Sequence, residues 1–197
     1  MCLIGSSGIH AGENVTKNNK TDIKNNIIKN NWYGVWCENT YNIYISFNDF
    51  SYNEWYAVWM EGINGEINRN NFEYNWYSIY LYNSLYFSLN NNTMFDNMHG
   101  SQFVNSSNNI FCFNKVYNNQ HYGIFFGWRS KINNIFSNNF INNSDNVRDD
   151  GYNNWDKNYW SDYLGLKIKF LFLLGFPYKI NKSLFDWHPA KEPYYIA

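Results

Sequence analysis

The chain has 197 residues, carries a formal net charge of −1, and is 22% aromatic. This length suits a single domain, and a near-balanced charge without like-charge runs gives no overall positive field that would attract nucleic acid. Asparagine is abundant, but it keeps a fixed phase with apolar residues, which indicates an ordered chain rather than a low-complexity segment.

The start of the chain, residues 1–9, lacks the basic region and the full apolar region of a signal peptide, so we predict no signal peptide in it. Gly8-Ile9 stands where Gly34-Val35 stands in a later repeat. This start is compatible with truncation of a longer gene, with any export signal upstream.

One short element recurs along the chain, and it first reads Asn31-Trp-Tyr-Gly-Val-Trp-Cys37. Its central small residue returns every 21 to 23 positions, at Gly34, Ala57, Ser78, Gly100 and Gly123. A fixed period of roughly 20–50 residues is typical of stacked-repeat proteins.

A second element keeps the same phase, with two apolar columns and an asparagine column that each recur every 22 residues. The members are Ile23, Ile45, Ile67, Leu89 and Phe111; Ile28, Phe50, Phe72, Met94 and Val116; and Asn26, Asn48, Asn70, Asn92 and Asn114. A second asparagine column precedes the first element, at Asn30 or Asn31, Asn53, Asn75, Asn97 and Asn119.

Both elements alternate apolar and polar residues and are rich in β-branched and aromatic residues, which favours short strands over helices. Strands stacked in turns of about 22 residues predict an all-β fold, a single-stranded parallel β-helix of about six turns. The leucine-rich repeat frame is absent. Asparagine tolerates the left-handed conformation of a sharp corner and can bond to its neighbours along a stack, so we interpret both columns as scaffold rather than as ligand-binding residues.

The repeats resemble those of the NosD-like, carbohydrate-binding and sugar hydrolase (CASH) family, which read N-N-x-I-x-N-N-x-x-Y-G-I-x-L-x-N-S, as do Asn26–Thr40 and Asn119–Phe126. Gly151–Gly165 looks like the N-Y-W-S-D-Y-x-G segment that closes many surface members of this family. Phe176–Ile180 and Asp186–Tyr194 look like its final P-Y-x-I and D-x-Y-P-L-x-x-P-Y motifs. The resemblance covers nearly the whole chain.

This resemblance implies a right-handed parallel β-helix and an extracellular or cell-surface location, with the remainder of a larger surface protein as a partner. Relatives usually carry an Asp/Gly-rich stretch suited to a hard cation where this chain has Leu166–Gly175, so calcium is not expected there. The family name also raises copper handling. His99 and His121, with Met98 beside them, are a faint signal for it, and substitution within an aromatic column explains these histidines as well.

Strand alternation predicts that Val35 and Cys37 face the core and that the small central residues face outward between two aromatic columns. Such a trough, with walls about 13 Å apart, would suit an extended glycan, because aromatic rings present flat apolar faces with polar edges. The predicted glycan-binding residues are Trp36, Trp59, Tyr80, Phe125, Trp32, Trp55 and Trp76. Two alternatives stay open, in which the tryptophans pack inward at a corner or the apolar run 164–176 covers the columns. That run contains Lys167 and Lys169 and is shorter than the roughly 20 residues of a membrane span, so no span is predicted.

An enzyme is the other class of function to weigh, because β-helix glycosidases and lyases use paired carboxylates. Glu38 and Glu61 fall on adjacent turns, but no base, metal ligand or substrate-binding arginine accompanies them. We therefore assign no catalytic residue, no metal ligand and no cofactor. Cys2, Cys37 and Cys112 lack a metal-binding spacing, and buried free thiols are the expectation.

The sequence thus predicts β-helix repeats over 1–144 and an irregular capping segment over 145–197. The predicted function is a non-catalytic surface module that binds polysaccharide or acts as a structural spacer. A carbohydrate-active enzyme, or a fragment of one, is the alternative, and a copper-handling accessory protein is a third.

Overall fold

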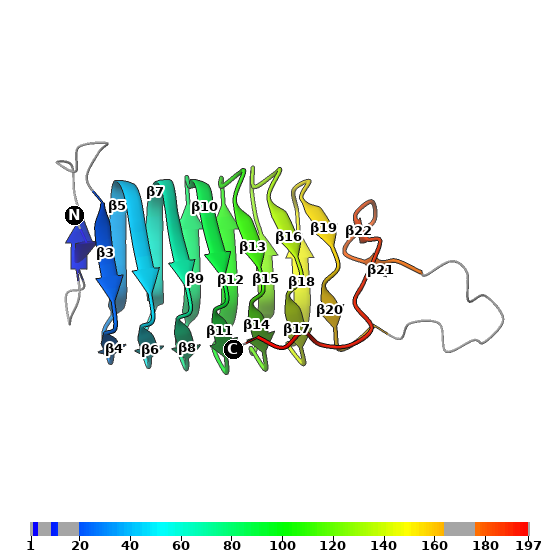
Figure 1. The fold of residues 1–197 in the computed structure, drawn as a ribbon, viewed down its shortest axis with the longest axis horizontal. Helices are drawn as coiled ribbons and strands as arrows, with labels where there is room; N and C mark the ends of the chain where they lie inside the picture. Colours follow the sequence, from blue (N-terminus) through cyan, green and yellow to red (C-terminus); the bar gives the residue numbers. More distant parts are fainter. Residues whose placement is uncertain (1, 4–8, 12–19, 164–175, 197) are drawn as a thin grey trace.

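The computed structural model describes residues 2–3, 9–11, 20–163 and 176–196. Within these residues all of the regular secondary structure is β-strand. The strands stack into a parallel β-helix of about six turns, seen from the side in Figure 1. This confirms the predicted fold class. None of the described segments forms a helix long and apolar enough to cross a bilayer.

The larger sheet has 13 strands and covers two faces of the β-helix, because the long strands β5 and β7 run round the corner between these faces. Its strands are β1 (Cys2–Leu3), β2 (Ile9–Ala11), β3 (Thr21–Lys24), β5 (Tyr33–Ser46), β7 (Tyr56–Asn68), β9 (Tyr77–Tyr82), β10 (Leu85–Asn90), β12 (His99–Val104), β13 (Ile110–Cys112), β15 (Tyr122–Phe126), β16 (Asn134–Phe136), β18 (Asp145–Asp149) and β19 (Asn154–Asp156).

A 7-stranded sheet of short strands forms the third face. Its strands are β4 (Ile27–Lys29), β6 (Asp49–Ser51), β8 (Asn71–Glu73), β11 (Thr93–Phe95), β14 (Lys115–Tyr117), β17 (Asn139–Ile141) and β20 (Tyr159–Trp160). A separate hairpin joins β21 (Tyr178–Lys179) to β22 (Phe185–Asp186).

Equivalent residues of successive turns lie opposite one another, so one kind of side chain runs through the core as a column. Phe50 lies opposite Phe72, with ring centroids 4.9 Å apart and nearly parallel planes. Phe140 stacks on Trp160 in the same way, at 4.6 Å. These side chains are fully buried, and the burial of each is worth about 1.5–3 kcal/mol relative to exposure.

Two of the corners are built on the predicted asparagine columns, whose side chains are buried in nearly every turn. In the first column each amide nitrogen donates to the amide oxygen of the next turn at 2.9–3.1 Å, from Asn26 to Asn158. In the second, from Asn31 to Asn143, the distances are 2.8–3.1 Å. The same oxygens also accept backbone N–H groups, for example the N–H of Asn70 from Asn92 at 3.0 Å. The columns therefore act as scaffold in the structure.

Each asparagine ladder reaches a carboxylate at its C-terminal end. Asp186 accepts hydrogen bonds from the side-chain amide and from the backbone N–H of Asn158. It thus takes the place that a further asparagine would have in the ladder. The second ladder passes through Asn146 to Asp162. A third, shorter ladder at another corner ends at Asp149. Amide donors point towards this end of each ladder, so an acceptor-only carboxylate satisfies the last of them. At Asp149 burial outweighs its hydrogen bonds from Trp155, Gly151 and Asn153 and raises the pKa of the carboxyl group.

The parallel pairing continues through β18, β19 and β20, past residue 144. The described residues 176–196 then lie against the end of the stack, where the Tyr178 and Trp160 rings are 4.1 Å apart. The last residues run back along the short-strand face (Figure 1), and Tyr194 exchanges two hydrogen bonds of 2.8 Å with the side chain of Asn139.

Cys37 is disulfide-bonded, so the expectation of free thiols is wrong for this residue. Its strand β5 pairs antiparallel with β1, a contact inside the first turn that sequence spacing could not reveal. Cys112 is free and buried, and burial raises the pKa of its thiol to about 11, which makes it an inert thiol near neutral pH.

Candidate functional site

Three tryptophans predicted to bind glycan form an exposed column at the corner before β5, β7 and β9. Trp32, Trp55 and Trp76 expose 48%, 41% and 44% of their surface. Their rings follow one another at 6.0 and 6.1 Å in a tilted stack. They therefore do not pack inward as corner filler.

Two tyrosines stand beside this column, one residue before the second asparagine ladder. Tyr52 and Tyr74 have φ values of 54° and 53°, and their rings stack at 5.0 Å. The left-handed conformation turns their side chains away from the core, and 55% and 45% of their surface is exposed. This conformation is unfavourable for bulky residues and costs on the order of 1 kcal/mol or more. Asparagine takes it in the first turn, at Asn30.

The tyrosines and Trp76 border an open groove of about 340 Å³, which we call the corner groove. Its lining residues are Tyr52, Asn53, Glu54, Tyr74, Asn75, Trp76, Asp96, Met98 and Gln120. Asn53 and Asn75 are buried ladder residues, so the groove has a floor that the scaffold holds rigid. Flat aromatic walls over a fixed floor, with carboxylates and an amide at the rim, suit a polar ligand with apolar faces.

Asp96 raises the pKa of the Tyr74 hydroxyl, with smaller contributions from burial and from Glu73. The hydroxyl therefore stays protonated at neutral pH and can both donate and accept a hydrogen bond. The groove thus offers hydroxyl, amide and carboxylate groups beside two aromatic surfaces.

The other predicted residues lie on the flat face of the sheet and are more covered. Trp36 and Trp59 stack at 4.0 Å, and only 8% of Trp59 is exposed. Tyr80 is half-buried against Tyr56, at 5.0 Å. Phe125 is half-buried against Tyr122, at 5.4 Å, and beneath the guanidinium of Arg148, at 5.0 Å. The structure therefore separates these four residues from Trp32, Trp55 and Trp76.

The small central residues do not form the floor of a trough. A Cβ added to Gly34 would lie 3.2 Å from the side chains of Ile28 and Phe50, so this position faces the core, as does the next residue, Val35. Two successive inward residues break the alternation at the bend. Tyrosines such as Tyr33 consequently pack against the Trp36 column, with ring centroids 4.7 Å apart. The predicted covering of the columns by 164–176 falls almost wholly outside the described residues.

The histidines do not fit a copper site as they are arranged. The rings of His99 and His121 are stacked, with centroids 5.1 Å apart and planes 25° apart. A metal ion lies close to the plane of each imidazole that binds it, and two nearly parallel planes at this distance share no such point. Met98 lines the corner groove. Across the described part of the chain, no three His, Cys, Asp or Glu side chains cluster closely enough to hold a metal ion.

We expect His99 to make the fold sensitive to acid. Burial, and secondarily His121, lowers its pKa to about 4, whereas an unfolded histidine titrates near 6.5. The unfolded chain therefore binds this proton first. The stabilising contribution is complete above about pH 6.5 and is lost as the pH falls towards 4.

The check is chemical denaturation at pH 7 and pH 4.5, with His99→Tyr as the comparison, because Tyr77 and Tyr122 are its neighbours in the column. Between pH 7 and pH 4.5 the free energy of unfolding of the wild type should fall by on the order of 1–2 kcal/mol more than that of the variant. The effect is kept this small because solvent screens a half-buried ring. Groups that titrate in both proteins cancel. Equal losses would contradict the assignment.

The carboxylates of the corner groove are not spaced like those of a retaining glycosidase. Glu54 follows Asn53, and Asp96 precedes Asn97, two turns further along the same asparagine ladder. The backbones of the two acidic residues are therefore about 9.6 Å apart. Retaining enzymes need about 5–5.5 Å between carboxyl groups, and inverting enzymes about 6.5–9.5 Å. The backbone separation is wider than the retaining spacing.

Sequence reasoning missed Tyr52, Tyr74, Glu54, Asp96 and Gln120 as partners of the tryptophans. The signal was present, because the tyrosines and Asp96 directly precede ladder asparagines. Recognising it required knowing that this position is left-handed and points outward.

A family model described as "Periplasmic copper-binding protein (NosD)" matches residues 4–165. No curated protein and no solved structure matches the chain. Because the match spans most of the chain, the protein belongs to the NosD family, as the repeats and the closing motif indicated.

Proposed function

We propose that this NosD-family β-helix is a non-catalytic module that binds a saccharide chain in its corner groove. The observation that carries the proposal is the row of exposed rings, Trp55, Trp76, Tyr52 and Tyr74, over a rigid asparagine floor. Tyrosine and tryptophan give large contact area at low entropic cost and combine an apolar face with a polar edge.

The backbone presents the two tyrosines to solvent. At these left-handed corners asparagine is the less strained residue, and the chain places exposed aromatic rings there instead. Exposed aromatic surface of this kind commonly marks a binding site on a soluble protein. The groove follows the stacking direction, so it suits an extended ligand rather than a single sugar.

A location outside the cytoplasm fits this role. The matching family is described as periplasmic, and Cys37 is disulfide-bonded, which is typical of an oxidising compartment. A cell-surface position, with this chain as part of a larger surface protein, is the extension of that proposal.

Tyr74→Asn tests the proposal, because it removes one ring while giving the corner its preferred residue. Affinity for the best ligand in a panel of neutral soluble polysaccharides should fall about tenfold, as expected when a stacking surface worth roughly 1.5 kcal/mol is lost. Stability should stay equal or rise by roughly 1 kcal/mol. Affinity electrophoresis and denaturant unfolding measure the two quantities.

The matched control is Phe47→Asn, since Phe47 has the same conformation, with a φ of 56°, at the other asparagine corner. It should leave affinity within twofold. Equal affinity loss in both variants, or none in Tyr74→Asn, would reject the groove as the binding site.

Copper binding is a second candidate, and the family description is the observation that favours it. The stacked rings of His99 and His121 would have to rotate apart to share one ion. Electron paramagnetic resonance of the protein with one equivalent of Cu(II) decides it. Nitrogen hyperfine structure that disappears in His99→Tyr would assign copper to this pair.

A further inference from the structure

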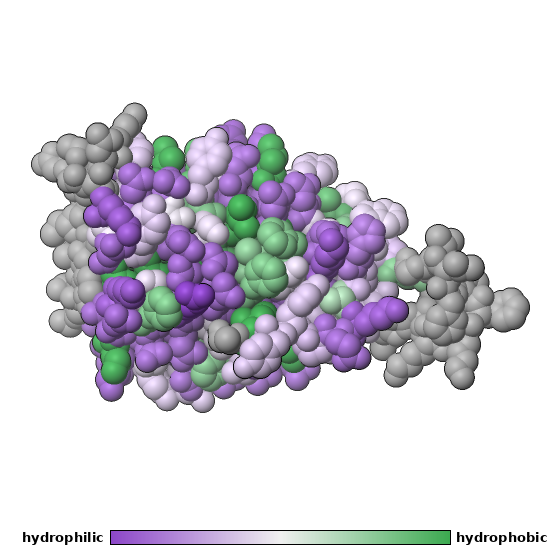
Figure 2. All heavy atoms as spheres, in the orientation of Figure 1, coloured by the Kyte–Doolittle hydropathy of each residue, from purple (hydrophilic) through white to green (hydrophobic). Residues whose placement is uncertain are grey.

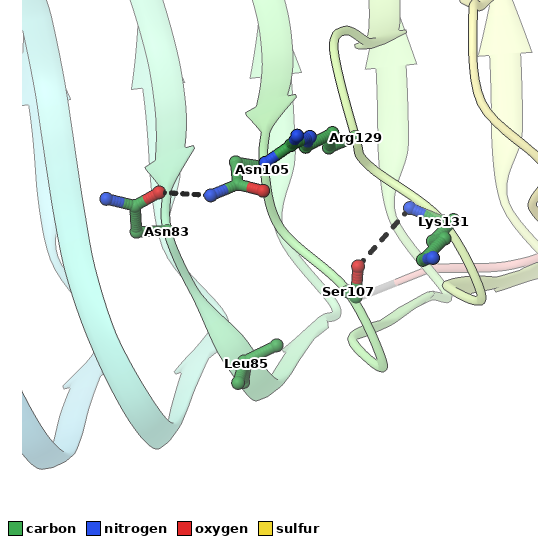
Figure 3. A pocket seen from close by; sticks show the side chains of 6 residues that line it. All are labelled: Asn83, Leu85, Asn105, Ser107, Arg129 and Lys131. Atoms are coloured by element: carbon green, nitrogen blue, oxygen red, sulfur yellow. Dashed lines mark hydrogen bonds between the residues drawn. The ribbon is translucent and has the colours of Figure 1, made fainter.

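A second hollow lies at the opposite end of the strand that begins beside the corner groove. It has a volume of about 650 Å³ and is lined by Asn83, Leu85, Asn105, Ser107, Arg129 and Lys131. We call it the cationic cavity (Figure 3). Strand β9 separates Trp76 from Asn83, which places the two sites about 23 Å apart.

The two cations stand on one rigid turn. Arg129 and Lys131 flank Ser130, which is fully buried. Its hydroxyl donates to the carbonyl oxygen of Phe103 at 2.9 Å and accepts the backbone N–H of Ser106 at 3.3 Å. The backbone of Arg129 and Lys131 is therefore held in place on either side of Ser130, while their own side chains remain exposed.

Arginine is not the residue that the fold favours at this corner. Asn83, Asn105 and Arg129 occupy equivalent corners on successive turns, with φ values of 47°, 49° and 56°. Asparagine is the residue that accepts this left-handed conformation most readily, and the amide of Asn105 bonds to that of Asn83 at 2.6 Å. Arg129 loses both advantages and brings a guanidinium to the cavity (Figure 3).

Neither cation is neutralised by a carboxylate of the described residues. Among the described residues, no carboxylate lies within 4.0 Å of Arg129 or Lys131. Asp150, on the following turn, is paired with Arg148 at 3.2 Å. The Arg129 guanidinium lies over the Trp128 ring, 4.3 Å from its centroid, which restricts its position and leaves its N–H groups for another partner.

We propose that the cationic cavity binds an anionic group, a carboxylate or a sulfate ester, carried by a saccharide. Arginine offers forked N–H donors that match such oxygens, lysine adds a second charge, and the Asn83 and Asn105 side chains and the Ser107 hydroxyl line the wall for neighbouring hydroxyl groups. A nucleic acid would need a row of cations along several phosphates, whereas the cavity offers two. Binding of an anionic group in the cationic cavity does not depend on binding of a saccharide in the corner groove.

The test compares dextran sulfate, polygalacturonate, unmodified dextran and a 16-residue single-stranded oligodeoxynucleotide by affinity electrophoresis in 50 mM salt. The variant is Arg129→Asn/Lys131→Gln, whose asparagine suits the corner. The matched control is Arg69→Asn, because Arg69 is also left-handed, with a φ of 51°, at another corner. Tyr74→Asn is included to separate the two sites.

We expect the wild type to bind dextran sulfate or polygalacturonate at least tenfold more tightly than dextran, and the double variant to lose at least tenfold of that affinity. Arg69→Asn and Tyr74→Asn should retain it within twofold. The difference in affinity between dextran sulfate and polygalacturonate shows whether the cavity prefers a sulfate ester or a carboxylate. The proposal is overturned if no anionic saccharide binds, if Arg69→Asn loses as much as the double variant, or if the oligodeoxynucleotide binds as tightly with the same dependence.

Discussion

Asn92→Ala is expected to destabilise the β-helix by about 3–5 kcal/mol, because several buried partners lose their hydrogen bonds at once. The Asn92 side chain is fully buried at the centre of its ladder. It accepts the backbone N–H and the amide of Asn70, at 3.0 and 3.1 Å, and donates to Ile67 and Asn114. Each buried group left without a partner costs about 1–3 kcal/mol, and alanine supplies none.

Denaturant unfolding measures this effect, with Asn134→Ala as the control. Asn134 is an exposed asparagine on β16, and its replacement should change the free energy of unfolding by less than about 0.5 kcal/mol. Similar small effects in both variants would show that the ladder contributes little, and that the stacked apolar columns alone hold the turns together.

Asp186→Asn is expected to cost about 2–4 kcal/mol and to release the C-terminal segment from the end of the stack. The buried carboxylate accepts N–H groups of Lys157, Asn158, Trp160 and His188 at 2.8–3.2 Å. An amide of the same shape has one oxygen instead of two, and its NH₂ group would face donors. It also removes the carboxylate from the donor end of the ladder.

Hydrogen exchange of the Lys157 and Asn158 backbone amides is the local readout, and both should lose protection in Asp186→Asn. Glu192→Gln is the control, since Glu192 is an exposed carboxylate of the same segment. Unchanged protection in Asp186→Asn would mean that packing of Tyr178 on Trp160, rather than the carboxylate, closes the stack.

Most of the fold could be predicted from the sequence repeat. Columns such as Phe50 and Phe72 recur at one period because each turn must present the same side chain to the core as the turn above it. The asparagine ladders followed for the same reason, since a buried amide needs a partner in both directions. The NosD resemblance rested on the same repeats.

Local geometry at the corners was beyond the pattern. Gly34 and Val35 both face the core, and strict alternation assigned one of them outward. That error placed the trough on the flat face, where Trp59 is buried, and overlooked Tyr52 and Tyr74. Alternation describes a straight strand, and it fails where the chain bends. The Cys37 disulfide was missed because it depends on the pairing of the first strand.

The corner groove as a saccharide site is the central claim, and tryptophan fluorescence of the wild-type protein tests it most directly. During titration with a panel of neutral soluble polysaccharides, the emission of exposed tryptophans such as Trp76 should shift to the blue or quench, and saturate with at least one ligand. The affinity obtained from this titration should fall about tenfold in Tyr74→Asn and should stay unchanged in Phe47→Asn. A flat response of the wild type across the panel would contradict the claim, and the module would then be a structural spacer.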